Sequence, residues 1–399
     1  MKKTLRQTIY LLLSFSTTFG QDPFDPKYKF SQDILDKLAK DTLNFKASWD
    51  LSFIGEYQKA LEIWDRDERK SPSIPQSYID NFSKYKPVDA NIFIQDKAKT
   101  EQIIILNEAH QQPYHRVFTT SILEELYNQG FRYFGAESIW NWDTLLNKRK
   151  YPLLKSGYYT QEPCYGNMIR EALRIGYKVF SYESTRQETD SAGINLREIA
   201  QAQNIKKILD KDPKAKILIH CGFDHLVETP YRGWGKCMAG RLIEYTGINP
   251  FTIDQTRFTE HASTEFDNPL FKIINLDYYA VFVDSSGHVF NGLPEHKDYD
   301  ARVYHPRTVW QNGRPQWMFD GGRKPYFIEK IKVTFPCLVL AYLADENIDV
   351  KKSEDMPIPY DVIELKNVSD KKALSLKKGM YNIIVKDKSG QEQKLSVTQ

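Results

Sequence analysis

The sequence lacks an excess of charge, a dense set of cysteines and, after its first residues, any long apolar run. Its 399 residues include 4 Cys, 20 Gly and 19 Pro, and 41% of them are hydrophobic. This composition excludes a collagenous, disordered or disulfide-rich chain. The net charge of +3 is accounted for by Lys2, Lys3 and Arg6 of the N-terminal leader. The rest of the chain has no net charge, so there is no electrostatic reason to expect nucleic acid or an anionic membrane as the main partner.

The leader has the order of a secretory signal. Charged residues up to Arg6 precede an apolar run from Ile9 to Phe15, and small and polar residues continue to Gly20. The apolar run is too short to span a bilayer of about 30 Å, and no later stretch predicts a transmembrane helix in the mature chain. We expect residues 1–20 to be a signal peptide and the protein to be secreted or periplasmic.

The four cysteines show no zinc-binding spacing. They are Cys164, Cys221, Cys237 and Cys337. In an oxidising compartment, a single disulfide between two of these cysteines remains an alternative. A catalytic thiol is not favoured, because a cysteine without a fixed base partner usually packs as a small apolar side chain.

The order of patterns along the chain predicts an α/β fold. It consists of a mainly parallel sheet flanked by helices, an N-terminal helical segment and a small β-rich C-terminal module. The N-terminal segment, residues 21–95, contains two amphipathic helices between Phe30 and Arg69 and is interpreted as a packing layer. Residues 96–330 form the α/β domain, and residues 331–399 form the β-rich module.

Short β-branched or aromatic runs alternate with helical patterns in the central part. Strands are expected at Ile103–Leu106, Tyr133–Ala136, Lys178–Tyr182, Lys216–Ile219 and Phe251–Ile253, and Tyr279–Val283 is a further candidate strand of the sheet. Helices are expected near Val117–Gln129, Met168–Ile175, Arg197–Asp210 and Met238–Thr246. The C-terminal strands are expected at Cys337–Leu343, Tyr360–Leu365, Met380–Lys386 and Lys394–Thr398.

Ionisable side chains follow the ends of four consecutive predicted strands. Because ligands bind at the carboxyl ends of strands in an open parallel sheet, this edge is the candidate site, and we expect it to face solvent. Each residue alone has a structural alternative, such as an N-cap contact for Glu183. The residues concerned are Glu108, His110, His115, Glu137, Glu183, His220 and His225.

The motifs around these residues resemble a known superfamily. Leu106–His115 resembles the Gly-Glu-x-His motif that opens ChaN-like iron-uptake proteins, and is similar to the opening motifs of erythromycin esterases and Tiki-type proteases. Three further segments resemble later motifs in order: Gly130–Glu137, Arg197–Ile205 and Ile217–Leu226. The chain departs from the pattern at Asn107, where Gly is usual, and at Ala200, where Met is common. The resemblance implies esterase, peptidase or haem-binding chemistry without choosing among them.

The first functional hypothesis is a hydrolase acting on a small-molecule or peptide substrate. His110 is the expected general base, and Glu108 or Glu137 is expected to orient it. His220 or His225 would stabilise the oxyanion or protonate the leaving group, and both imidazoles are expected to face Glu137. His115, Glu183 and Arg197 are possible supporting residues. In a metal-assisted variant, Glu108, His110, Glu137 and His220 would bind a divalent ion.

The second hypothesis is a non-catalytic haem or iron binding protein, as the ChaN resemblance implies. Tyrosine pairs such as Tyr158-Tyr159 and Tyr278-Tyr279 are candidate contacts for a planar ligand. The C-terminal module has no ionisable cluster of its own, so we expect it to be dispensable for the chemistry.

Overall fold

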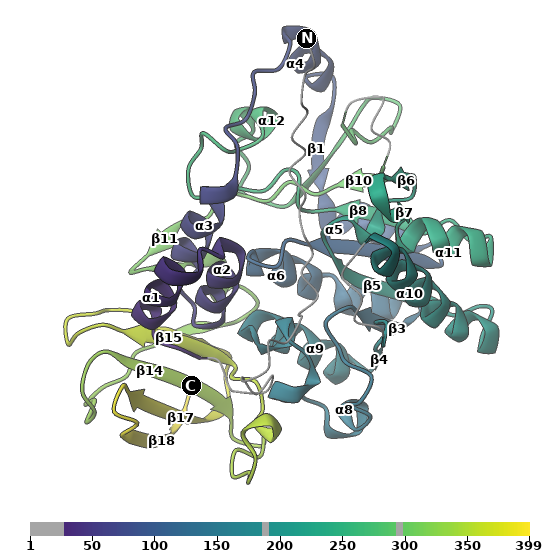
Figure 1. Ribbon diagram of the computed structural model, residues 1–399. Helices are drawn as coiled ribbons and strands as arrows, with labels where there is room; N and C mark the ends of the chain where they lie inside the picture. Colours follow the sequence, from purple (N-terminus) through teal and green to yellow (C-terminus); the bar gives the residue numbers. More distant parts are fainter. Residues whose placement is uncertain (1–27, 186–190, 293–297) are drawn as a thin grey trace.

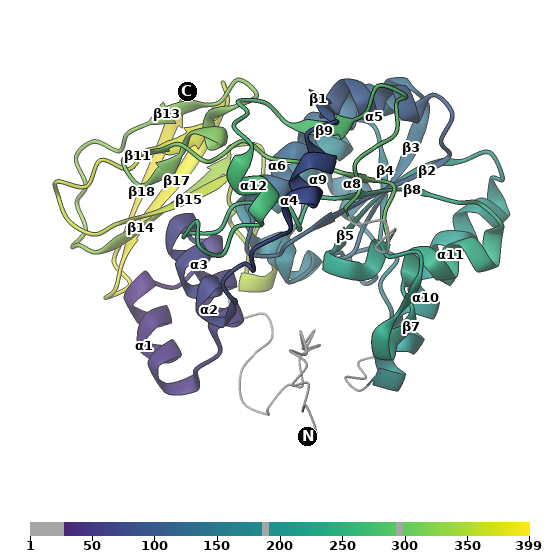
Figure 2. The same ribbon diagram turned by 90° about the horizontal axis from the view of Figure 1, so that it is seen from above.

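The computed structural model describes residues 28–185, 191–292 and 298–399, so the expected signal peptide lies outside the described residues. Figures 1 and 2 show a parallel sheet flanked by helices, with a second sheet beside the N-terminal helices. No helix in these described ranges is long and apolar enough to cross a membrane.

The larger sheet has six parallel strands in the order β10-β8-β2-β5-β3-β4. Its strands are β2 (Ile103–Glu108), β3 (Phe131–Ala136), β4 (Lys178–Phe180), β5 (Lys216–Gly222), β8 (Phe251–Asp254) and β10 (Ala301–Arg302). The predicted parallel sheet is therefore confirmed, and β10 adds an edge strand that the sequence pattern did not indicate. Every residue of β2 is buried, as expected for a strand covered on both faces.

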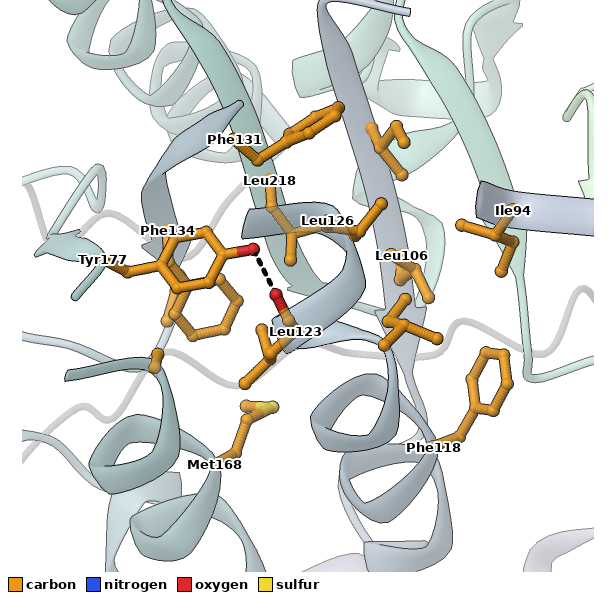
Figure 3. Close-up of a cluster of buried hydrophobic side chains, with 14 of the residues drawn as sticks. Ile94, Leu106, Phe118, Leu123, Leu126, Phe131, Phe134, Met168, Tyr177 and Leu218 are labelled. Atoms are coloured by element: carbon orange, nitrogen blue, oxygen red, sulfur yellow. Dashed lines mark hydrogen bonds between the residues drawn. The ribbon is translucent and has the colours of Figure 1, made fainter. Parts of the chain in front are cut away.

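Helices cover both faces of this sheet. One face packs against α5 (Ala90–Ala98), α6 (Pro113–Ser121), α7 (Leu123–Asn128) and α9 (Pro163–Ile175), and the other against α10 (Ser191–Lys211) and α11 (Met238–Thr246). Ile104 and Leu106 of β2 point to the first face, whereas Ile103 and Ile105 point to the second. Figure 3 shows the first core, in which the Tyr177 hydroxyl donates to the Leu123 carbonyl at 2.8 Å.

Two central elements differ from the predictions. The helix expected at Val117–Gln129 is divided into α6 and α7 at Ile122, which takes a φ of −98° and a ψ of −4°. The strand expected at Tyr279–Val283 is β9 (Ala280–Val283), but it does not join the parallel sheet. It pairs antiparallel with β1 (Lys86–Asp89), a strand within the segment expected to be helical. Because β1 and β9 lie far apart in the sequence, no local sequence pattern indicates that they pair.

The C-terminal part is β-rich, as predicted. Its antiparallel sheet has the order β15-β14-β17-β18, formed by β15 (Asp361–Leu365), β14 (Cys337–Leu343), β17 (Met380–Asp387) and β18 (Glu392–Thr398). A second pair joins β13 (Lys324–Tyr326) to β16 (Leu374–Leu376). Some of this pairing starts before residue 331, the boundary expected from the sequence.

The N-terminal helices share a core with the C-terminal sheet. There are three helices where two are predicted: α1 (Ser31–Asp41), α2 (Asn44–Phe53) and α3 (Tyr57–Trp64). Gly55, with a φ of 74°, separates α2 from α3. The shared core includes Ile34, Leu38, Leu51, Ile63, Leu338, Leu340, Tyr342 and Val362. The N-terminal helices and the C-terminal sheet lie side by side in Figure 1 and share this core.

The remaining elements are short. They are α4 (Gln76–Phe82), α8 (Leu146–Arg149), α12 (Pro269–Ile273), β6 (Pro230–Tyr231), β7 (Gly235–Lys236), β11 (Trp310–Gln311) and β12 (Arg314–Pro315). All four cysteines are buried and unpaired, so the disulfide that the sequence left open is not formed. Burial raises the pKa of the Cys164 and Cys221 thiols well above the ordinary value, which keeps both protonated.

Candidate active site

The carboxyl ends of β2, β3 and β5 bring the sequence-predicted residues together. Glu108, the last residue of β2, lies opposite Gly222 of β5, and Ala136 of β3 lies opposite His220. The next residue after β3 is Glu137, and the turn after β5 carries His225. The strand register therefore places carboxylates and imidazoles from separate segments at one edge.

This edge does not face solvent, contrary to expectation. His110 is 2% exposed, His220 and His225 are 0% exposed, and Glu137 is 6% exposed. Aromatic side chains cover His110: Tyr159 stacks on its imidazole with ring centroids 3.7 Å apart, and Trp49 and Phe223 contact it edge-on. The sequence could not indicate this cover, because Trp49 comes from α2, in the segment interpreted as a packing layer.

Glu108 is the centre of the first half of the site. Its carboxylate accepts from Arg116 Nε at 2.6 Å and from Arg116 Nη2 at 2.7 Å. It also contacts His110 Nδ1 at 2.8 Å and His220 Nε2 at 2.9 Å. Burial alone would raise the pKa of Glu108, but the Arg116 guanidinium and the hydrogen bonds hold it well below its ordinary value. Glu108 is therefore ionised and acts as an acceptor for all these groups.

The state of Glu108 determines the tautomer of His110. Because an ionised carboxylate can only accept, the hydrogen of neutral His110 lies on Nδ1, and Nε2 keeps a lone pair. Burial lowers the pKa of His110 below its ordinary value despite the neighbouring Glu108, which favours this neutral form. His110 Nε2 is buried and has no hydrogen-bond partner among the residues that the structure describes. It is therefore an oriented base with its lone pair unused.

The free His110 Nε2 and a Glu137 oxygen both lie close to Gly222. A Cβ added to Gly222 would lie 2.7 Å from His110 Nε2 and 3.2 Å from Glu137 Oε2. The two acceptors are consequently no more than about 6 Å apart. Because these distances are shorter than ordinary contacts, the absence of a side chain at Gly222 is what allows His110 and Glu137 to pack this closely against the strand.

Glu137 belongs to a second charged group. Its Oε2 accepts from the Gly222 amide at 2.5 Å, and its Oε1 accepts from Arg197 Nη2 at 2.6 Å. Arg197 Nε also donates to Glu183 Oε1 at 2.9 Å. Burial would raise the pKa of Glu137, but His225 and Arg197 lower it well below the ordinary value. Glu183 thus acts through Arg197, at a distance from the space beside Gly222.

His225 is held between two carboxylates. Its Nδ1 lies 2.9 Å from Glu198 Oε2, and its Nε2 lies 3.3 Å from Glu137 Oε1. Burial would lower the pKa of His225, but Glu137 and Glu198 raise it to about 10, so this imidazole is charged at neutral pH. Arg197 Nη1 lies 3.0 Å from His225 Nε2, and the other terminal nitrogen of Arg197, Nη2, donates to Glu137 Oε1.

The imidazoles of His220 and His115 contact groups other than the Glu137 carboxylate, although the His220 carbonyl accepts from the Glu137 amide at 3.1 Å. The expectation that both His220 and His225 face Glu137 is wrong for His220, whose Nε2 contacts Glu108 instead. His115 Nδ1 accepts from the Ala109 amide at 3.0 Å, and burial lowers its pKa to about 3. His115 therefore supports the turn that carries His110 as a neutral group.

Several residues of the site were not predicted from the sequence. Arg116 binds Glu108 and also donates to Glu162 Oε2 at 3.0 Å, and both Arg116 and Glu162 are fully buried. Glu198 fixes His225, and its Oε2 also accepts from the Met238 amide at 2.7 Å. Arg116 directly follows His115 and Glu198 directly follows Arg197, so an adjacent charge was the available signal in both cases.

The proposed metal ligands do not fit a divalent ion in this arrangement. Arg116 donates to both oxygens of Glu108, and its positive charge would repel a cation placed there. Within residues 28–185, 191–292 and 298–399, no three His, Cys, Asp or Glu side chains are arranged to hold a metal ion.

Comparisons with known proteins give little guidance. No family model and no curated protein matches the chain. The type III effector HopBA1 is 9% identical with a TM-score of 0.38, over 56% of this chain and 96% of that one. An effector domain of a Vibrio vulnificus toxin, RRSP, is 13% identical with a TM-score of 0.30, over 64% of this chain and 49% of that one.

A third similar structure is the C-terminal region of Pasteurella multocida toxin, described as having a thiol-protease like catalytic triad. It is 13% identical with a TM-score of 0.31, over 77% of this chain and 37% of that one. At these TM-scores the matches support no conclusion about fold or function, so the function is argued from the site itself.

Proposed function

We propose that the protein is a hydrolase of ester or amide bonds that acts outside the cytoplasm on a small-molecule or peptide substrate. The observation that supports this proposal is His110. Its Nδ1 is fixed by an ionised carboxylate, and its unpartnered Nε2 lies beside Gly222, as does Glu137 Oε2. A general base needs this arrangement of an orienting acceptor on one nitrogen and a free lone pair on the other.

In the proposed reaction a water donates one hydrogen to His110 Nε2 and the other to Glu137 Oε2. As the water oxygen attacks the carbonyl carbon, its proton moves to His110 Nε2. Glu108 stabilises the resulting imidazolium through Nδ1–H. When the bond to the leaving group breaks, His110 returns that proton to the leaving oxygen or nitrogen. His225 and Arg197 keep Glu137 ionised throughout.

The motif resemblance stated above supports the same proposal. Glu108 and His110 have the Glu-x-His spacing of the ChaN-like opening motif, and they are similar to the Glu-x-x-His start of erythromycin esterases, which has one more residue between the two. An absorbance scan of the purified protein incubated with haemin distinguishes the haem-binding alternative from the hydrolase proposal. We expect no Soret band that is displaced from that of free haemin. A stoichiometric shifted band that disappears in His110→Ala would favour the alternative.

The test of the hydrolase proposal is turnover of a substrate panel by the wild type and His110→Gln. The panel contains p-nitrophenyl acetate, p-nitrophenyl butyrate and short peptide p-nitroanilides. We expect His110→Gln to reduce kcat/KM by about 100-fold or more at equal folded fraction. The control is His288→Gln. His288 is an exposed histidine that pairs with Asp284, four residues before it, and it is distant in sequence from His110. Equal losses in both variants, or unchanged turnover in His110→Gln, would contradict the proposal.

A further inference from the structure

Trp49 carries a second unused hydrogen-bonding atom beside His110. It is 5% exposed, and its indole Nε1 has no hydrogen-bond partner among the described residues. Its ring centroid lies 5.9 Å from that of His110 and 5.2 Å from that of Tyr159, nearly perpendicular to both. A buried indole N–H usually finds an acceptor, so an unpaired one next to a candidate site indicates a group that is missing from the structure.

The two unused atoms are complementary. His110 Nε2 is an acceptor and Trp49 Nε1 is a donor, and both belong to the same aromatic cluster. Hydrolysis of a carbonyl compound needs both kinds of group: an acceptor for the proton of the water and a donor for the carbonyl oxygen, which becomes negative as the water adds.

The donors nearest Glu137 are already engaged. The Gly222 amide donates to Glu137 Oε2, and Arg197 Nη2 donates to Glu137 Oε1. Arg116 is likewise engaged by Glu108 and Glu162. The proposed reaction therefore needs a further donor for the substrate oxygen.

We propose that Trp49 Nε1 donates a hydrogen bond to the carbonyl oxygen of the substrate, an inference that rests on the proposed hydrolase function. A water bound to His110 Nε2 lies about 3 Å from it, and the carbonyl carbon lies about 3 Å beyond the water in a reactive complex. Trp49 is a direct neighbour of His110 in the same aromatic cluster, with ring centroids 5.9 Å apart. As the carbon–oxygen bond to water forms, the carbonyl π electrons move to that oxygen, and the indole hydrogen bond stabilises its charge.

This inference gives the N-terminal helices a role in the chemistry. Trp49 lies on α2, whose Ala47 and Leu51 pack in the core shared with Leu338 and Val362 of the C-terminal sheet. Segments that contribute nothing to the edge of the parallel sheet would thus position a group that contacts the substrate.

The test compares Trp49→Phe with the wild type, using a p-nitrophenyl ester that the wild type hydrolyses. Phenylalanine keeps the aromatic cover and removes the N–H. We expect kcat to fall by about 100-fold while KM changes by less than about 3-fold. The matched control is Trp142→Phe: Trp142 is 56% exposed, and its indole N–H already donates to the Lys155 carbonyl at 3.1 Å. We expect its kcat to remain within about 2-fold of the wild type.

A second variant separates loss of the donor from loss of packing. Benzothienylalanine at position 49 keeps the shape of the indole and replaces its N–H by sulfur, so it should reproduce the kcat loss of Trp49→Phe in a folded protein. In the wild type, the indole N–H resonance of Trp49 should shift when 1,1,1-trifluoroacetone is added, because its hydrate resembles the tetrahedral intermediate.

Normal kcat in the folded benzothienylalanine protein, together with full loss in His110→Gln, would overturn the role of Trp49 and leave the hydrolase proposal standing. If neither the benzothienylalanine protein nor His110→Gln loses activity, both the role of Trp49 and the hydrolase proposal would be overturned. An indole resonance that does not respond to trifluoroacetone would also contradict the inference.

Discussion

A methyl group at position 222 would press against His110 and Glu137, and Gly222→Ala is therefore a direct perturbation of the proposed water site. Gly222 has a φ of −88° and a ψ of 146°, a conformation that alanine adopts without strain. The added Cβ would lie 2.4 Å from His110 Cε1 and 2.7 Å from His110 Nε2. Ordinary contacts are 3.4 to 4 Å, so the imidazole must move by about 1 Å.

That movement is opposed by the neighbours of His110. Tyr159 stacks on the ring at 3.7 Å, and Glu108 holds Nδ1 at 2.8 Å. We expect the overpacking to cost about 1–3 kcal/mol of stability. Because a misplacement of about 1 Å can reduce a rate about 100-fold, and the methyl also occupies the space for water, we expect kcat/KM to fall by at least about 100-fold.

The assay is steady-state hydrolysis of the best p-nitrophenyl ester at a temperature where the variant is fully folded, checked by near-UV circular dichroism. Gly379→Ala is the control, because the nearest atom to its added Cβ, Tyr381 Cε2, lies at an ordinary 3.7 Å. A folded Gly222→Ala protein with kcat/KM within about 3-fold of the wild type would refute the assignment of this space to the attacking water.

Three further predictions concern charge and architecture. His225 has its pKa raised to about 10 by Glu137 and Glu198, so its stabilisation is complete below the unfolded value of about 6.5 and is lost as the pH rises through about 10. Urea unfolding should show this decline in the wild type and a flatter pH dependence in His225→Gln; parallel curves would contradict it. The kcat/KM profile should fall on the acid side with a pKa below 6.5, because burial lowers the pKa of His110; an acid limb above 7 would contradict this. Truncation before residue 331 should destabilise the protein, because it removes Leu338 and Leu340 from the core of the N-terminal helices; cooperative unfolding at the wild-type temperature would show that these helices need no such support.

The parallel sheet and the meeting of ionisable side chains at one of its edges could be predicted because their signals are local. Ile103–Leu106 is a continuous apolar run, and Glu108 and His110 follow it within four residues. In a parallel sheet, the ends of such strands necessarily meet at one edge. This is why Glu108, Glu137 and His225 could be assigned to one site before their contacts were known.

The cover of the site and its charge balance could not be predicted in the same way. Tyr57 of α3 donates to Glu162 at 3.1 Å across 105 positions of sequence, and Trp49 reaches His110 from α2. An amphipathic helix pattern shows which face is buried but not which distant segment it contacts. The sequence therefore indicated the candidate base and acids, whereas the aromatic cover and the Arg116 network required the tertiary structure.

The central claim is that His110 carries its hydrogen on Nδ1 and a free lone pair on Nε2. Two-bond proton–nitrogen correlation spectra of ¹⁵N-histidine-labelled protein at pH 7 measure this directly, with His110→Gln used to assign the resonances. The account predicts a neutral imidazole with protonated Nδ1 and unprotonated Nε2. A His110 protonated at Nε2, as the other neutral tautomer or as an imidazolium at pH 7, would contradict it.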